Sequence, residues 1–176
     1  MLLVQSERNA LLASLTAVVG VVERRHTLPI LSNLLLERKA GALTVLATDL
    51  ELQVSTRLEN AEGGEDFGIT IAARKLFDIV RALPDSAKVK LDTKDSQVVV
   101  SAGKSRFTLQ TLPAADFPRV ETGSGLGEAI RVPQKTLKRL LQLVQFAMAS
   151  QDIRYYLNGM LLVLDGKQLR AVATDG

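Results

Sequence analysis

The sequence lacks cysteine and tryptophan, and it holds a single histidine, His26, among its 176 residues. The absence of cysteine excludes disulfides, zinc–thiolate sites and cysteine nucleophiles. One histidine is too few for a metal site built from several histidines. We also expect no histidine-based catalytic triad. A chain without cysteine also suits a reducing compartment, so we expect a cytoplasmic protein.

Long hydrophobic runs are also missing. The longest nearly apolar stretch, residues 11–22, is too short to span a bilayer and contains Ser14 and Thr16. The opening residues, MLLVQSERN, lack the basic region of a secretory signal. The sequence therefore predicts a soluble protein with no membrane partner.

Aromatic residues are scarce, at 4% of the chain, yet both tyrosines stand together at Tyr155 and Tyr156. Gln151 and Arg154 lie beside them. The pair could be buried in a core, or it could contact a ligand that carries phosphates or flat rings.

Three segments have the apolar spacing of amphipathic helices: residues 6–19, 73–83 and 134–149. Ser6 is expected to cap the first helix. Pro133 is expected to be the first residue of the third helix, after a short strand over residues 129–132.

Strand-like segments surround these helices, and part of their pattern is repeated near the end of the sequence. The segments are residues 33–39, 42–58, 68–72, 88–93, 97–103 and 106–112. Residues 33–49 and 158–175 share an opening asparagine, an apolar run, a glycine turn and a closing Ala-Thr-Asp. A helix followed by three strands also occurs twice before residue 113. The pattern predicts repeated units of one design.

Residues 113–128 are rich in proline and glycine and have little periodicity. We therefore expect a first domain over residues 1–122, a linker over 123–128 and a truncated second domain over 129–176. The glycines of this linker do not lie between a strand and a helix, as a phosphate-binding loop requires.

Carboxylates at Asp49, Glu51 and Asp175 raise the possibility of a metal site. Asp49 and Asp175 both close an Ala-Thr-Asp segment at the end of a strand, where aspartate commonly accepts hydrogen bonds in a turn. We expect this structural role, and hence no catalytic or metal site and no cofactor. An enzyme with a metal on Asp49 and Glu51 is the alternative.

Basic residues give the strongest indication of function, although the net charge is only +3. The predicted helix over 134–149 carries Lys135, Lys138 and Arg139 and no acidic residue. The helix over 73–83 carries Arg74 in a further basic cluster, with Asp78 as its only acid. Cationic helix faces of this kind suit a phosphate backbone, and their low density favours weak, sequence-independent contact.

Several segments in the same order resemble the bacterial sliding clamps, the beta subunit family of DNA polymerase III. They include TLPILSNLLLE (27–37), AARKLFDI (72–79), GKSRFTLQTLPAADFP (103–118) and QDIRYYLNGMLL (151–162). The resemblance implies an α+β fold of clamp domains, each a pair of βαβββ-like halves with helices on one face of antiparallel sheets. It also implies a processivity factor, not an enzyme: a homodimeric ring that encircles duplex DNA and tethers the replicative polymerase.

The resemblance also implies roles for particular residues. The expected DNA contacts, including the basic helix faces, are Arg25, Arg74, Lys135, Lys138, Arg139, Gln151, Arg154, Tyr155 and Tyr156. The expected subunit interface comprises Lys75, Phe107 and Leu109. Leu157, Thr174 and Gly176 match the edge of a cleft for peptides of the polymerase and the clamp loader.

The length of the chain departs from the family pattern. The remainder of the second domain and all of the third have no counterpart here, so we expect an amino-terminal portion of a clamp. Ring closure and a complete peptide cleft need the missing parts. A stand-alone domain that binds DNA without sequence preference is therefore the alternative function.

Overall fold

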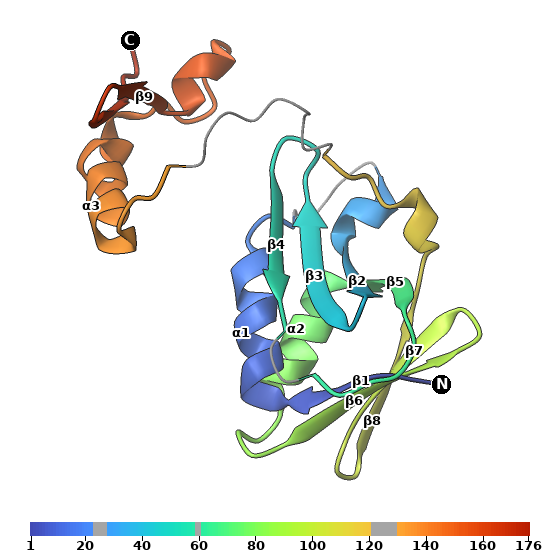
Figure 1. Cartoon of the computed structure of the whole chain (residues 1–176). Helices are drawn as coiled ribbons and strands as arrows, with labels where there is room; N and C mark the ends of the chain where they lie inside the picture. The colour runs from blue at the N-terminus through green and yellow to red at the C-terminus, as the bar shows by residue number, and fades with distance from the viewer. Residues whose placement is uncertain (23–27, 59–60, 121–129) are drawn as a thin grey trace. The chain divides into compact units, whose positions relative to one another are not determined.

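The computed structural model describes residues 1–22, 28–58, 61–120 and 130–176. The chain divides into two units, Met1–Thr122 and Gly123–Gly176, each of which forms its own contacts (Figure 1). The expected linker over 123–128 lies outside the described residues. Among the helices that the structure describes, none combines the length and apolar character needed to cross a membrane.

Unit 1 contains two successive halves with the same order of elements. The first half comprises β1 (Leu2–Glu7), α1 (Arg8–Val19), β2 (Asn33–Lys39), β3 (Ala42–Thr48) and β4 (Gln53–Arg57). The second half comprises β5 (Phe67–Ala72), α2 (Ala73–Ala82), β6 (Lys88–Lys94), β7 (Gln97–Ala102) and β8 (Ser105–Gln110). Two short 3-10 helices, η1 (Pro29–Ser32) and η2 (Ala114–Asp116), lie outside this pattern. The predicted α+β fold with βαβββ halves is confirmed.

The two halves of unit 1 exchange their first strands. One sheet has the order β1-β6-β7-β8 and the other has the order β4-β3-β2-β5. Glu7 of β1 pairs with Lys88 of β6, and Asn33 of β2 pairs with Ala72 of β5, both in antiparallel ladders. Each four-stranded sheet therefore needs a strand from the other half, so neither half completes its sheet alone.

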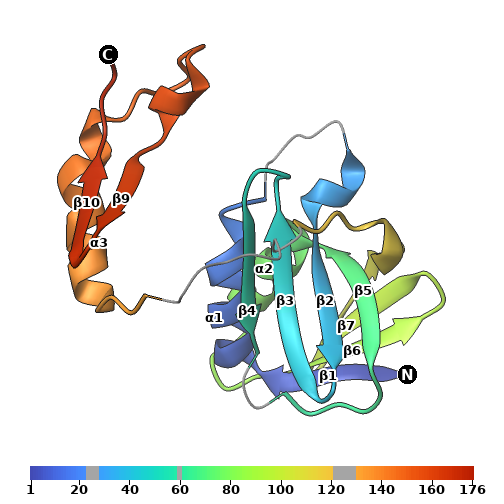
Figure 2. The ribbon, with the colours of Figure 1, turned by 45° about the horizontal axis from the view of Figure 1, so that its top comes forward.

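The two helices of unit 1 pack side by side against the β4-β3-β2-β5 sheet (Figures 1 and 2). Helix α1 buries Leu11, Leu15 and Val18, which are four and three residues apart and so share one face. Helix α2 buries Leu76 and Val80 in the same way. Each fully buried leucine or valine stabilises the fold by about 1.5–3 kcal/mol. The outer faces of α1 and α2 stay exposed.

Unit 2 repeats only part of this plan. It contains α3 (Gln134–Val144), η3 (Gln145–Ala147), η4 (Tyr155–Asn158) and a hairpin of β9 (Leu161–Asp165) and β10 (Gln168–Val172). Helix α3 packs on β10, but none of its residues is buried. Leu161, Leu164 and Phe146 are exposed over 62%, 53% and 87% of their surface. The apolar side of this unit is therefore largely uncovered.

Two expected features at the ends of helices are wrong. Ser6 does not cap α1: it lies in β1, opposite Val89, and its hydroxyl donates to the carbonyl of Glu7 at 3.2 Å. The strand β1 extends through Glu7 because β6 supplies a hydrogen-bonding partner that local sequence cannot reveal. Pro133 is the N-cap of α3 and not its first helical residue.

The strand expected over residues 129–132 does not form at its described positions, 130–132. In unit 1 the corresponding strand of each half pairs with the other half. The described part of unit 2 has one α-helix and one hairpin, so this segment has no second half with which to pair. A strand without a paired neighbour can form its backbone hydrogen bonds only with water, so it gains no ladder that would stabilise it.

Candidate nucleic-acid interface

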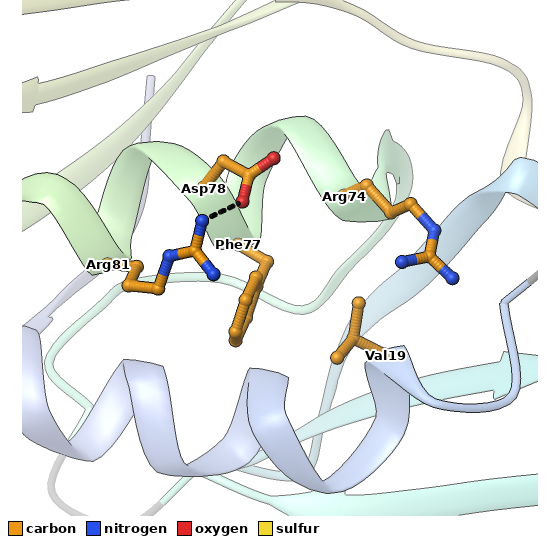
Figure 3. A pocket seen from close by; sticks show the side chains of 5 residues that line it. All are labelled: Val19, Arg74, Phe77, Asp78 and Arg81. Atoms are coloured by element: carbon orange, nitrogen blue, oxygen red, sulfur yellow. Dashed lines mark ion pairs between the residues drawn. The ribbon is translucent and has the colours of Figure 1, made fainter. Parts of the chain in front are cut away.

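A hollow of about 360 Å³ lies between α1 and α2 on the surface of unit 1. Val19 of α1 and four residues of α2, Arg74, Phe77, Asp78 and Arg81, line it (Figure 3). The α2 positions 74, 78 and 81 are four and three residues apart, so their side chains share one helix face. This face is the one that the sequence marks as basic.

The two arginines of this hollow are held differently. Arg74 donates an Nη2 hydrogen bond to the carbonyl of Val22 at 2.7 Å, which ties α2 to the chain after α1. Arg81 Nη2 lies 2.9 Å from Asp78 Oδ1, and the Arg81 guanidinium carbon lies 5.3 Å from the centre of the Phe77 ring. Among the described residues Arg74 has no ion-pair partner, whereas Asp78 pairs with Arg81.

Helix α3 provides a second cationic surface. Lys135, Lys138 and Arg139 are exposed, and within the described residues none of the three makes a hydrogen bond or an ion pair. No acidic residue occurs in α3. The opposite face, with Leu137 and Leu141 half-buried, packs on β10. These three charges are therefore available to an external anion.

The tyrosine pair forms the start of η4 and is open to solvent. Tyr155 is exposed over 82% of its surface and Tyr156 over 67%. Their rings meet edge to face, with centres 5.9 Å apart and planes at 79°. Burial in a core, the alternative raised for this pair, is wrong in this structure. Both phenols can donate a hydrogen bond outward.

The predicted DNA contact Arg154 is already engaged within unit 2. Its Nε and Nη2 donate to the two carboxylate oxygens of Asp152 at 3.0 and 2.9 Å, and Nη2 also donates to the carbonyl of Asp175 at 3.2 Å. The hydrogen bonds from Arg154 hold the pKa of the Asp152 carboxyl below its usual range, and the pKa of Arg154 is raised in turn. Arg154 therefore joins η4 to the last residues of the chain.

Gln151 and Arg25 are the two remaining predicted DNA contacts. Gln151 is exposed beside η4 and has a positive φ of 60°, so the chain turns sharply there. Arg25 lies outside the described residues.

Of the expected subunit-interface residues, Phe107 and Leu109 lie on β8 and Lys75 lies on α2. Lys75 and Leu109 line one hollow of about 250 Å³, between α2 and β8. Phe107, two residues before Leu109 on the same face of β8, is exposed over 40% of its surface. Because β8 is the last strand of its sheet, its outer backbone groups are open to another strand.

The expected peptide-cleft residues gather around Arg154. Leu157 is buried, and its amide donates to the carbonyl of Arg154 at 2.8 Å. Thr174 Oγ1 accepts a hydrogen bond from the amide of Gly176 at 3.1 Å. A side chain at Gly176, where φ is +102°, would approach the Arg154 guanidinium to 2.8 Å. Arg154 thus connects the tyrosine segment to the edge of the expected cleft.

Asp49 has the structural role that its position predicts. Its Oδ1 accepts the amides of Glu51 and Leu52 at 3.0 and 2.7 Å, which closes the turn between β3 and β4. Across the described residues, no group of three metal-binding side chains comes together.

Sequence reasoning missed the pairing of Arg81 with Asp78 on the basic face of α2. The three-residue spacing on one helix could have suggested it. It also missed the hydrogen-bonded ion pair between Arg154 and Asp152. That pair depends on a local turn that the spacing alone does not specify.

The chain matches two family profiles that follow one another along its length. Residues 2–121 match the DNA polymerase III beta subunit, N-terminal domain, and residues 131–176 match the central domain of the same subunit.

Individual relatives agree with these profiles. The beta sliding clamp of Pseudomonas putida is 49% identical and that of Escherichia coli 46% identical, each over 97% of this chain and 46% of the relative. A crystal structure of the DNA polymerase III subunit beta from Pseudomonas aeruginosa has a TM-score of 0.91 at 48% identity, over 100% of this chain and 47% of that one. The chain spans about half the length of these relatives. It belongs to the DNA polymerase III beta subunit family, the beta sliding clamps.

Proposed function

We propose that this chain acts as part of a sliding clamp, a ring that encircles duplex DNA and tethers a replicative polymerase without catalysing a reaction. The observation that supports this function most directly is the acid-free face of α3, where Lys135, Lys138 and Arg139 have no partner among the described residues. Unpaired cations on a rigid helix attract phosphates.

The chemistry of these side chains accounts for sequence-independent contact. Lysine and arginine that reach only phosphates position a protein on DNA but carry no information about the bases. A few such contacts give an affinity that is weak and sensitive to salt. Weak contact suits a clamp, because a ring holds DNA by topology and must still move along it.

The other expected site residues would contact DNA, form the homodimer interface or form the peptide cleft. Arg74, Gln151, Tyr155 and Tyr156 would contact DNA, together with Arg25. Lys75, Phe107 and Leu109 would form the homodimer interface along the β8 edge. Leu157, Thr174 and Gly176 would form one side of the cleft for peptides of the polymerase and the clamp loader. Arg154 would support this cleft and η4 more than it contacts phosphate, because it already binds Asp152.

We assign the domains in the same way. Residues 1–122 would form one clamp domain, and residues 129–176 would contribute the helix and hairpin of a second. Helix α3 with β9 and β10 would correspond to α1 with β2 and β3, in agreement with the repeat of residues 33–49 and 158–175.

The experiment compares Lys138→Ala and Arg74→Ala with Lys167→Ala, a matched control that removes an exposed lysine from the turn between β9 and β10. Binding to a short mixed-sequence duplex is measured by fluorescence anisotropy over a range of salt concentrations. Each test variant should weaken binding and make the salt slope shallower by about 0.9 for each phosphate that the side chain had neutralised.

Three results would contradict the proposal. The control could weaken binding as much as the test variants do. One DNA sequence could be strongly preferred. Magnesium-dependent turnover of DNA, abolished in Asp49→Asn, would instead favour the enzyme.

A stand-alone DNA-binding domain is the second candidate, because the charges of α3 are unpaired among the described residues of unit 2 itself. The two candidates predict different retention of the protein on a circular DNA after the circle is linearised. A closed ring is released when the circle is linearised, whereas a protein held by affinity stays bound to both forms equally.

A further inference from the structure

We propose that the hollow between α1 and α2 seats one backbone phosphate of duplex DNA between Arg74 and Arg81, and that Asp78 is a built-in counter-charge that keeps this contact weak. The inference deepens the proposed function and rests on it. It adds Arg81 to the DNA-contacting residues and gives a role to the one acidic residue on the basic face of α2.

The shape of the hollow suits a small anion held from two sides. Arg74 and Arg81 lie at opposite ends of the hollow, with Phe77 and Asp78 between them (Figure 3). Val19 of α1 closes one wall. Guanidinium groups present several N–H donors in a plane that matches phosphate oxygens. Both arginines line the same hollow of about 360 Å³, so each can offer N–H donors to an anion that enters it.

Arg81 is free to change partners because its ion pair lies in solvent. Its side chain is exposed over 63% of its surface and that of Asp78 over 61%. Exposed ion pairs are weak, and salt screens them further. The guanidinium also lies over the Phe77 ring, which keeps it at the hollow when Asp78 releases it.

The backbone beneath Arg81 is fixed independently of its side chain. Arg8 donates from Nη2 to the carbonyl of Arg81 at 2.7 Å and from Nε to the carbonyl of Val80 at 3.0 Å. These bonds reach carbonyls of the last turn of α2, one of which, that of Val80, also accepts the amide of the C-cap residue Leu83 at 3.3 Å. The Arg81 side chain can therefore swing from Asp78 to a phosphate without moving the helix.

Asp78 lowers the affinity for DNA in two ways. It occupies Arg81, and its own negative charge repels a phosphate that enters the hollow. With Asp78 present, the two arginines and one aspartate leave a single net positive charge; without it there would be two. A clamp must move along DNA, so an aspartate at this point limits the affinity of a surface that would otherwise hold a phosphate firmly.

The test uses Asp78→Asn, which removes the charge and keeps the shape. Asp95→Asn is the matched control, because Asp95 is an exposed aspartate in the turn between β6 and β7 whose positive φ of 53° suits asparagine. Affinity for a short mixed-sequence duplex is measured by fluorescence anisotropy as a function of salt. Thermal unfolding of each variant confirms that the fold is kept.

Asp78→Asn should bind the duplex about twofold to fivefold more tightly than Asp95→Asn, the size of one exposed charge interaction. Its salt slope should be steeper by up to about 0.9, which corresponds to one more neutralised phosphate. In the double variant Asp78→Asn with Arg81→Ala, the increase in affinity above the Arg81→Ala single variant should fall well below that of Asp78→Asn alone.

Two results would overturn the proposal: equal affinity of Asp78→Asn and Asp95→Asn, or the full increase persisting when Arg81 is replaced. These outcomes are distinct from failure of the proposed function. If Lys138→Ala still weakens binding while Asp78→Asn has no effect, only the role of Asp78 is rejected. If no variant and no parent protein binds the duplex, both proposals are rejected.

Discussion

Arg119 donates two hydrogen bonds to Glu37, with Nη2 2.7 Å from Oε1 and Nη1 3.2 Å from Oε2. Glu37 lies on β2, and Arg119 lies in the segment that follows η2. The amide of Val120 also donates to Gln53 Oε1 of β4, and Phe117 is buried. The end of unit 1 is thus attached to the β4-β3-β2-β5 sheet before the chain continues to unit 2.

The Glu37–Arg119 pair predicts a dependence of stability on pH. The hydrogen bond from Arg119, followed by that from Lys39, holds the pKa of the Glu37 carboxyl below its usual range. A carboxyl whose folded pKa is lowered stabilises the fold above its unfolded pKa, and this stability is lost as pH falls through the folded pKa. Arg119→Ala should lower the free energy of unfolding at pH 7 by about 1 kcal/mol.

Urea unfolding at pH 7 and near pH 3 tests this prediction. The difference between Arg119→Ala and the parent should shrink as the pH falls through the lowered pKa of Glu37, because protonation removes the charge that Arg119 stabilises. Arg106→Ala, an exposed arginine on β8 without a partner among the described residues, is the control. An equal difference at both pH values would show that the ion pair is not its source.

The exposed tyrosines should contact duplex DNA through the phenol. Tyr155→Phe keeps the ring and removes the hydroxyl, so it should weaken duplex binding by about twofold to fivefold, the size of one hydrogen bond. Binding of single-stranded DNA, where bases stack on rings, should change little. Tyr155→Ala should weaken both, and anisotropy with the two DNA forms separates these effects. Equal weakening for both forms in Tyr155→Phe would contradict a phenol–phosphate contact.

The bonds of Arg154 predict a coupling between η4 and the end of the chain. Arg154→Ala removes the bonds to Asp152 and Asp175, so the backbone amide signals of residues 173–176 and of η4 should shift together. A two-dimensional amide NMR spectrum measures this change, and signals of unit 1 serve as the internal reference. Arg170→Ala is the control, because it removes an exposed ion pair with Asp165 elsewhere in unit 2. Unchanged signals at Gly176 would exclude the coupling.

The uncovered apolar side of unit 2 predicts low local stability. Helix α3 has no buried residue, whereas Val98 and Val100 of β7 are fully buried in unit 1. Amide hydrogen exchange should therefore be at least about tenfold faster in α3 and β9 than in β7, because local opening of unit 2 exposes little additional apolar surface. Mass spectrometry of exchanged peptides measures this difference. Equal protection of both units would mean that some contact covers α3 in solution.

Features that depend on neighbouring residues could be predicted from sequence. The spacing of Leu76 and Val80, with Pro84 after them, predicts α2 almost to its ends, and the Ala40-Gly41 turn predicts the β2–β3 hairpin. The acid-free face of α3 is also visible in the sequence, since side chains three and four residues apart share a helix face. The family resemblance depends on such local segments and is confirmed.

Features that depend on distant residues could not be predicted in this way. β1 ends at Glu7 because β6, which comes from the other half of unit 1, supplies its hydrogen-bonding partner, and residues 130–132 lack a strand because no such partner is described. The hydrogen bond from Arg154 to the carbonyl of Asp175, 21 residues later, likewise cannot be deduced from neighbouring residues.

Helix periodicity and turn chemistry are encoded within a few residues, and so the two runs of a helix and three strands in unit 1, the basic faces of α2 and α3 and the paired tyrosines follow directly from the order of amino acids. Which half contributes a strand to which sheet is decided only when distant segments meet. Such contacts depend on loop closure and on competition between partners, which no local pattern records.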